Sequence, residues 1–207
     1  IALEGGEGAG KSTQCRLLAA ALAARGIEAV VTREPGGTPG AEAIRTLLLS
    51  TEGEGWLPRA EALLFAAARS DHVERLIRPA LAAGRWVICD RFLDSSRAYQ
   101  GGGSGLSDAD ILDLHRIGSD GLLPDLTVLM ELAPAEAVRR LSARDTGGSD
   151  RIGGRDNAYH ARVSAAFAHL AEADPQRFVR IDSGATRETT HAEIMTALAP
   201  LLEELRG

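Results

Sequence analysis

Residues 4–13, EGGEGAGKST, contain the only lysine of this 207-residue chain, because 22 of its 23 Lys and Arg residues are arginine. The run from Gly5 to Ser12 matches the pattern G-x-x-x-x-G-K-[ST] at every required position. In that pattern, backbone N–H groups at the start of a helix surround phosphate oxygens, and the lysine reaches the β- and γ-phosphates. A planar guanidinium does not fit a loop shaped for one compact ammonium, which explains the lysine at position 11.

This run predicts a phosphate loop that binds ATP, with Lys11 as a catalytic residue and the Ser12 hydroxyl as a ligand of Mg2+. The alternative is a glycine-rich turn between a strand and a helix that binds nothing. The predicted ATP-binding residues are consecutive: Gly5, Gly6, Glu7, Gly8, Ala9, Gly10, Lys11, Ser12 and Thr13.

A second candidate for phosphate chemistry is the pair Asp90-Arg91, which ends the apolar run that starts at Trp86. Parallel sheets bind ligands at the carboxyl ends of their strands. Asp90 can hold Mg2+, directly or through water, and Arg91 can neutralise a phosphoryl group in transfer. We predict both as catalytic residues, the alternative being an ion pair at the surface.

Several classes of protein are excluded or disfavoured by what the sequence lacks. The guanine-reading motif N-K-x-D is missing, because the only asparagine, Asn157, precedes alanine, and YQGGGSG lacks the Leu-Ser of a transporter-ATPase signature. A net charge of −6 argues against binding a nucleic-acid polymer. The longest apolar runs are too short to span a bilayer. Two distant cysteines, Cys15 and Cys89, favour a reducing compartment, so we expect a cytoplasmic protein.

The elements that must position these residues alternate between short β-rich runs and longer helical patterns. This alternation predicts one α/β domain over residues 1–207, with a parallel sheet covered by helices on both faces. Glycine-rich interruptions stand at 101–105 and 146–156, and the second, with its arginines, suggests a lid at about 144–156. The predicted strands are 1–4, 28–33, 86–90, 126–132 and 178–182, and the predicted helices are 11–25, 41–49, 59–82, 108–120, 134–144, 156–173 and 186–205.

Further motifs make the sequence resemble the thymidylate kinase family. They are REPGGT at 33–38, LLFAAAR at 63–69, Asp90-Arg91, SSRAYQGGG at 95–103 and Asp-Arg-Ile at 150–152. The resemblance implies the P-loop NTPase fold, with a five-stranded parallel sheet in the order 2-3-1-4-5. It also implies a homodimer.

The resemblance also implies roles for individual residues around a bound dTMP. Phe65 would stack on the thymine ring, Arg69 would read its carbonyl edge, and Tyr99 would pack against the sugar. On pattern alone Phe65 would by default be a core residue, and Arg45 could be an ordinary exposed helical arginine. The implied dTMP-binding residues are Glu7, Pro35, Arg45, Phe65, Arg69, Arg91, Ser96, Tyr99 and Gln100.

The sequence departs from the family pattern at two positions. Some members have arginine in the phosphate loop where this chain has Gly8, and bacterial-type members instead carry lid arginines, a pattern that Arg151 and Arg155 resemble. We therefore predict Arg151 as a catalytic residue that reaches the transferring phosphate when the lid closes. Phe92 stands where the family would have Tyr or His.

Together these observations predict an enzyme that transfers the γ-phosphoryl group of ATP to dTMP, with Mg2+ held by Ser12 and Asp90. We expect nucleotides as its small-molecule partners, and neither a nucleic-acid polymer nor a membrane. The alternatives are another nucleoside monophosphate kinase, or a non-catalytic sensor that binds ATP and changes shape.

Overall fold

The computed structural model describes residues 1–144 and 150–204. Its centre is a five-stranded parallel sheet in the order β2-β3-β1-β4-β5, as predicted. The predicted strand positions are confirmed, and β3 and β5 have the predicted bounds. The strands are β1 (Ala2–Glu4), β2 (Ala29–Arg33), β3 (Trp86–Asp90), β4 (Thr127–Glu131) and β5 (Phe178–Asp182).

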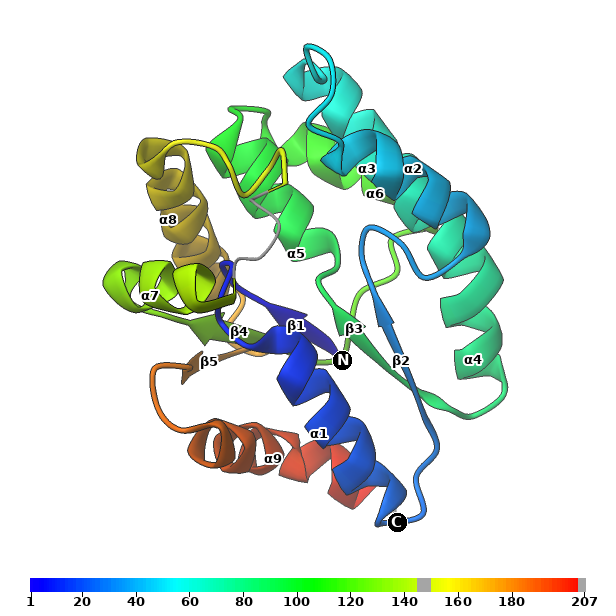
Figure 1. The fold of residues 1–207 in the computed structure, drawn as a ribbon. Coiled ribbons are helices and arrows are strands. Elements are labelled where there is room, and N and C mark those ends of the chain that lie inside the picture. Colours follow the sequence, from blue (N-terminus) through cyan, green and yellow to red (C-terminus); the bar gives the residue numbers. More distant parts are fainter. Residues whose placement is uncertain (145–149, 205–207) are drawn as a thin grey trace.

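Helices cover both faces of this sheet (Figure 1). Within the described residues, every predicted helical region contains a helix, although the region predicted as one helix over 59–82 is built from α3, the π-helical η1 and α4; residue 205 of the last predicted helix lies outside the described residues. The helical elements are α1 (Lys11–Ala23), α2 (Pro39–Leu49), α3 (Pro58–His72), η1 (Val73–Ile77), α4 (Arg78–Ala82), α5 (Leu93–Ser96), η2 (Arg97–Gly103), α6 (Asp108–Ser119), α7 (Pro134–Arg144), α8 (Asn157–Ala173) and α9 (Arg187–Glu204). None of these helices, within the described ranges, has the length and apolar character needed to cross a membrane.

The expectation of a glycine-rich interruption at 101–105 was wrong for its first three residues, which lie inside η2. Glycine is needed there for packing: a Cβ on Gly102 would lie 2.4 Å from Cβ of Ala166, and one on Gly103 would lie 2.6 Å from the Tyr159 ring. These glycines therefore let η2 approach α8 closely.

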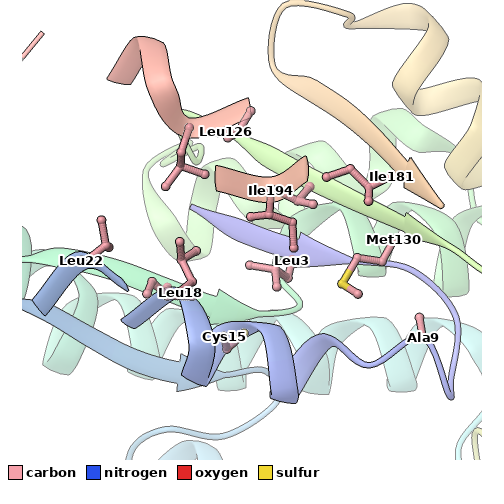
Figure 2. Packing of buried hydrophobic residues seen from close by; sticks show 12 residues of the cluster. Leu3, Ala9, Cys15, Leu18, Leu22, Leu126, Met130, Ile181 and Ile194 are labelled. Atoms are coloured by element: carbon pink, nitrogen blue, oxygen red, sulfur yellow. The ribbon is translucent and has the colours of Figure 1, made fainter. Parts of the chain in front are cut away.

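The alternation of side chains along the strands divides the core between the two faces of the sheet. Ile88 faces the cluster formed with α1 and α9, whereas Val87 and Cys89 face the cluster formed with α3, η1 and α4. Figure 2 shows the first cluster, in which Leu3 of β1 lies against Leu18 of α1 and Ile194 of α9. This packing fixes α1 against β1, and so fixes both ends of the loop that connects them.

β1 lies between β3 and β4, so the chain crosses to opposite sides of β1 in the two halves of the sheet. Ligands of such sheets bind where the strand order reverses, at the carboxyl ends of the strands. The phosphate loop follows β1 and the Asp90-Arg91 pair ends β3, so both lie at this point.

Candidate active site

The phosphate loop wraps closely against the sheet and leads directly into α1. Gly5 has φ 129°, and a Cβ at this position would lie 2.3 Å from the backbone oxygen of Met130. Gly10, with φ 89°, is the left-handed residue that precedes the first turn of α1. These conformations are open to glycine and strained for other residues, so the glycines are required by the path of the chain.

Lys11 is held inside this loop by the backbone that surrounds it. Its Nζ donates to the carbonyl oxygens of Gly5 and Gly6, at 3.0 and 2.7 Å. Burial, and then the positive charge of Arg91, lower the pKa of Lys11 to about 7. An ammonium desolvated in this way gains from an anionic ligand, which is what a polyphosphate chain supplies.

Ser12 and Asp90 meet at the mouth of the loop, where the Ser12 hydroxyl donates to Oδ2 of Asp90 at 2.5 Å. Both side chains also line the adjoining cavity. A hydroxyl and one carboxylate are oxygen donors of the kind that Mg2+ prefers when phosphates and water supply its other ligands. Within residues 1–144 and 150–204, no three His, Cys, Asp or Glu side chains are grouped to hold a metal by themselves.

A cavity of about 280 Å3 extends from these two residues between α2, α3 and the segment that follows β3. All nine residues that the resemblance implied for dTMP contribute to its wall. Among the described residues, the wall consists of Glu7, Ser12, Arg33, Glu34, Pro35, Arg45, Leu49, Phe65, Arg69, Asp90, Arg91, Phe92, Ser95, Ser96, Tyr99, Gln100, Asp150 and Ile152.

One end of the cavity is strongly cationic. Arg91, in a left-handed conformation with φ 71°, donates to the Gly5 oxygen at 2.9 Å and lies 5.0 Å from the centre of the Tyr99 ring. Arg45 donates to the Pro35 oxygen at 2.7 Å, and burial together with the charge of Arg33 lowers the pKa of Arg45. Arginines crowded in this way are stabilised by a dianion.

A buried carboxylate, Glu4, holds the backbone that carries Arg91. Oε1 of Glu4 accepts from the N–H of Phe92 at 2.7 Å and of Ser95 at 3.1 Å, and its Oε2 accepts from the Ser95 hydroxyl at 2.6 Å. Burial, and then the charge of Asp94, raises the pKa of Glu4 to about 7. Glu4 of β1 therefore fixes the backbone of the bend that follows β3.

The other end of the cavity pairs an aromatic ring with a buried arginine. Phe65 is half-buried on α3, and Arg69, one turn later on the same helix, is only 3% exposed. Nε of Arg69 donates to Glu34 at 2.7 Å, and its Nη2 donates to the Ser96 hydroxyl at 2.8 Å and to the Phe92 oxygen at 3.1 Å. Its Nη1 has no hydrogen-bond acceptor among the described residues. An aromatic face beside a fixed planar donor can recognise a nucleobase.

Gln100 is held at the same end by a buried carboxylate from α3. Nε2 of Gln100 donates to Oε1 of Glu61 at 3.0 Å, and Oε2 of Glu61 is paired with Arg155. Tyr99, beside Gln100, receives on its backbone oxygen a hydrogen bond of 3.1 Å from the Tyr159 hydroxyl. Tyr159 itself is buried against η2.

The predicted lid is described only in part, since residues 145–149 lie outside the described ranges. Asp150 and Ile152 line the cavity, but Arg151 does not. The guanidinium of Arg151 donates to the carbonyl oxygens of Ser50 and Glu52, at 2.5 and 2.6 Å. The catalytic role of Arg151 stays a prediction, and in this arrangement contact with a phosphoryl group would require the side chain to leave these acceptors.

Sequence reasoning missed the acidic residues that hold the site together: Glu4, Glu34 and Glu61. Each is a carboxylate that is at most 5% exposed, and each binds a segment of the cavity wall. Glu34 stands inside REPGGT and Glu4 directly precedes the phosphate loop, so their positions were available as signals. The wall residues Arg33, Leu49, Phe92, Ser95, Asp150 and Ile152 were also not predicted as ligand-binding residues.

Comparisons with known proteins agree with this geometry. The profile of the family described as thymidylate kinase matches residues 3–194. A thymidylate kinase of Rhizorhabdus wittichii is 55% identical over 98% of this chain and 97% of its own length, and one of Gluconobacter oxydans is 50% identical over 96% and 92%. The crystal structure of thymidylate kinase from Ehrlichia chaffeensis superposes with a TM-score of 0.77 at 32% identity, covering 96% of this chain and 97% of that one. The chain belongs to the thymidylate kinase family of phosphotransferases.

Proposed function

We propose that this chain transfers the γ-phosphoryl group of ATP to dTMP, giving ADP and dTDP for nucleotide biosynthesis, with the phosphate loop binding the donor and the cavity binding the acceptor. Membership of the thymidylate kinase family supports this reaction. The observation that carries the assignment of sites is the cavity itself: it joins an aromatic ring and a fixed arginine at one end to crowded arginines at the other.

On the donor side, residues 5–13 hold the phosphates of ATP. The backbone N–H groups at the start of α1 and the partial positive charge of the helix favour the phosphate oxygens. Lys11 exchanges its carbonyl partners, Gly5 and Gly6, for the β- and γ-phosphates. Its role as a catalytic residue is to neutralise charge that builds up on those oxygens during transfer.

On the acceptor side, Arg91 and Arg45 bind the monophosphate of dTMP. Arg91 lies between the phosphate loop and the cavity, so it contacts both the acceptor and the group in transfer. The acceptor phosphate attacks as a dianion at neutral pH and therefore needs no base to remove a proton. Catalysis then consists of alignment in line and of charge neutralisation.

At the far end of the cavity, Phe65 stacks on thymine and Arg69 donates to a base carbonyl. Ser96 and Gln100 add polar contacts to the nucleotide, and Pro35 of the REPGGT segment lines the cavity. Tyr99 packs against the sugar, and Glu7 of the phosphate loop, which also lines the cavity, accepts from the 3′-hydroxyl. The family resemblance implies these roles, and the position of each side chain in the cavity wall supports them.

We also propose that Mg2+ is bound by Ser12 and Asp90, whose oxygens are already adjacent. When bound, the metal would supply positive charge that offsets the negative charge of the ATP phosphates. Asp90 would hold it directly or through water, and no further carboxylate is required.

We further propose a homodimer through α3 and α6. These two helices pack together and expose Leu63 (56%), Leu112 (39%) and Ile117 (73%) to solvent. Exposed apolar side chains on adjacent helices favour a protein interface. We place the protein in the cytoplasm, since Cys15 and Cys89 are free buried thiols.

The test of the function is a coupled ADP-release assay with ATP and Mg2+, offering dTMP, dUMP, UMP, CMP, AMP and GMP in parallel. The expected result is the highest kcat/KM for dTMP. Equal or greater activity on another monophosphate would reject the proposed acceptor, and binding of ATP without turnover of any of the six would reject the reaction.

A further inference from the structure

The arginine proposed to read the base is the end of a buried chain of hydrogen bonds. Thr32 of β2, His72 of α3 and Glu34 follow one another before Arg69 is reached. Oγ1 of Thr32 lies 2.7 Å from Nε2 of His72, and Nδ1 of His72 lies 3.0 Å from Oε1 of Glu34. The other oxygen, Oε2 of Glu34, receives the Nε–H of Arg69 at 2.7 Å.

The chemistry of these partners determines the direction of each hydrogen bond. An ionised carboxylate only accepts, so Nδ1 of His72 must carry a proton and donate to Glu34. A neutral His72 then accepts at Nε2 from the Thr32 hydroxyl.

These linked hydrogen bonds give a physical reason for several residues in and beside the REPGGT segment. Thr32 directly precedes this segment, Glu34 lies in it, and its Gly37 packs against the His72 imidazole. A Cβ on Gly37 would lie 2.5 Å from Oγ1 of Thr32 and 2.7 Å from Nε2 of His72, so only glycine leaves room for their hydrogen bond. The segment therefore serves the base-reading end of the cavity as well as the phosphate end.

We propose that His72, acting through Glu34, is a positioning residue that sets the base specificity of the acceptor site, an inference that rests on the proposed function of Arg69. Two fixed partners hold both oxygens of Glu34 in place, and Glu34 with Ser96 then holds the plane of the Arg69 guanidinium. Without His72, the carboxylate can turn and Arg69 loses its orientation. An N–H donor held in place cannot hydrogen-bond to an amino group, which is itself a donor. It therefore disfavours a base that has an amino group in place of the carbonyl.

The test compares His72→Leu, which removes both hydrogen bonds, with His72→Asn, whose amide nitrogen can take the place of Nδ1 toward Glu34. For His72→Leu we expect KM for dTMP to rise about tenfold and the preference for dTMP over dCMP to fall about tenfold. The kcat for dTMP and KM for ATP should stay within about twofold, because the phosphate end is unchanged. His72→Asn should restore most of the preference.

A second pair of variants keeps the proposal testable if His72→Leu does not fold. Thr32→Val removes only the hydroxyl that fixes Nε2, and Thr190→Val, on α9, is the matched buried threonine, 2% exposed. Thr32→Val should raise KM for dTMP about threefold, and Thr190→Val should not. An unchanged dTMP preference in folded His72→Leu and Thr32→Val would overturn the proposal. Equal losses of kcat on both nucleotides would do so as well, because a merely structural role predicts that result.

A measurement without substrate separates this inference from the proposed function. In 15N-labelled protein, the Nε–H of Arg69, assigned by its loss in Arg69→Lys, should exchange slowly with water and at least about tenfold faster in His72→Leu. Unchanged exchange would overturn the positioning role. Failure of the parent enzyme to phosphorylate dTMP would instead reject the proposed function, and the exchange rates would still decide whether His72 fixes Arg69.

Discussion

The phosphate loop and the base-reading end of the cavity both present polar groups to a ligand, but the loop takes them from consecutive residues and the base end takes them from segments far apart in the sequence. In the loop, nine consecutive residues supply the backbone N–H groups, the lysine and the carbonyls that hold it. At the base end, Arg69 depends on partners 27 and 35 residues away in the chain. The first site is a local conformation and the second is a product of packing between separate segments.

This difference has energetic consequences. The loop presents groups whose partners are exchanged when ligand binds, so Lys11 is held by carbonyls that phosphate oxygens can replace. At the base end, Glu34 and His72 are satisfied before any ligand arrives, and each is at most 5% exposed. Buried networks of this kind are costly to leave half-satisfied, which gives them rigidity and makes them suited to specificity.

The largest expected effect comes from removing the charge of the loop. Lys11→Met should reduce kcat by about 1,000-fold or more, because the ammonium is the only side-chain cation in the run 4–13 that can neutralise the β- and γ-phosphates. Binding of dTMP, measured by calorimetry without ATP, should be retained. Lys11→Arg should fail almost equally, and substantial activity in that variant would contradict the argument that the loop requires a compact ammonium.

The next effect tests the base end through its aromatic ring. Phe65→Leu should raise KM for dTMP about tenfold through loss of stacking, with KM for ATP unchanged. The matched control is Phe178→Leu in β5, which replaces a buried ring outside the cavity wall. That control should lower the thermal midpoint and leave KM for dTMP unaltered. An increase in KM in both variants would show that general packing, and not stacking on the base, is responsible.

The pH dependence of ATP binding tests the titration of Lys11 in the phosphate loop, and dTMP binding at the other site serves as the comparison. Because burial lowers the pKa of Lys11 to about 7, the free enzyme loses the ammonium as pH rises through 7, whereas bound phosphates favour the protonated form. Affinity for ATP should therefore fall about fivefold between pH 7 and 8, with proton uptake on binding. Calorimetry in buffers of different ionisation enthalpy measures that uptake, and dTMP binding without ATP serves as the comparison. Absence of proton uptake at pH 8 would contradict the lowered pKa.

The smallest effect is expected at the edge of the predicted lid. Arg151→Ala removes a side chain that holds the backbone of residues 50–53, and these contacts alone predict a change in kcat of no more than about threefold. Single-turnover measurements with saturating dTMP would check this. A loss of kcat of about 100-fold would instead establish that Arg151 leaves its carbonyl partners and reaches the transferring phosphate.

Much of the fold and of the cavity could be predicted because the relevant signals are short. The strand 86–90 is apolar up to its final Asp90, and 178–182 contains the apolar residues Phe178, Val179 and Ile181; both strands have the predicted bounds. The helical state of residues 101–103 could not be predicted from glycines that disfavour helix in isolation, since close contact with α8 decides it. The contact of Arg151 with carbonyls about 100 positions earlier could not be predicted, because nothing in its own segment indicates them.

By itself, the sequence determined the phosphate loop and its single lysine, because consecutive backbone amides and glycine conformations are local properties. The sequence motifs also supported the family resemblance that implied the dTMP-binding residues. Only the tertiary structure decided how those residues are held: the pairing of Arg69 with Glu34, of Glu34 with His72 and of Gln100 with Glu61. These contacts join segments 35 to 39 residues apart, and whether a buried charge has a partner depends on which segments the packed core brings together.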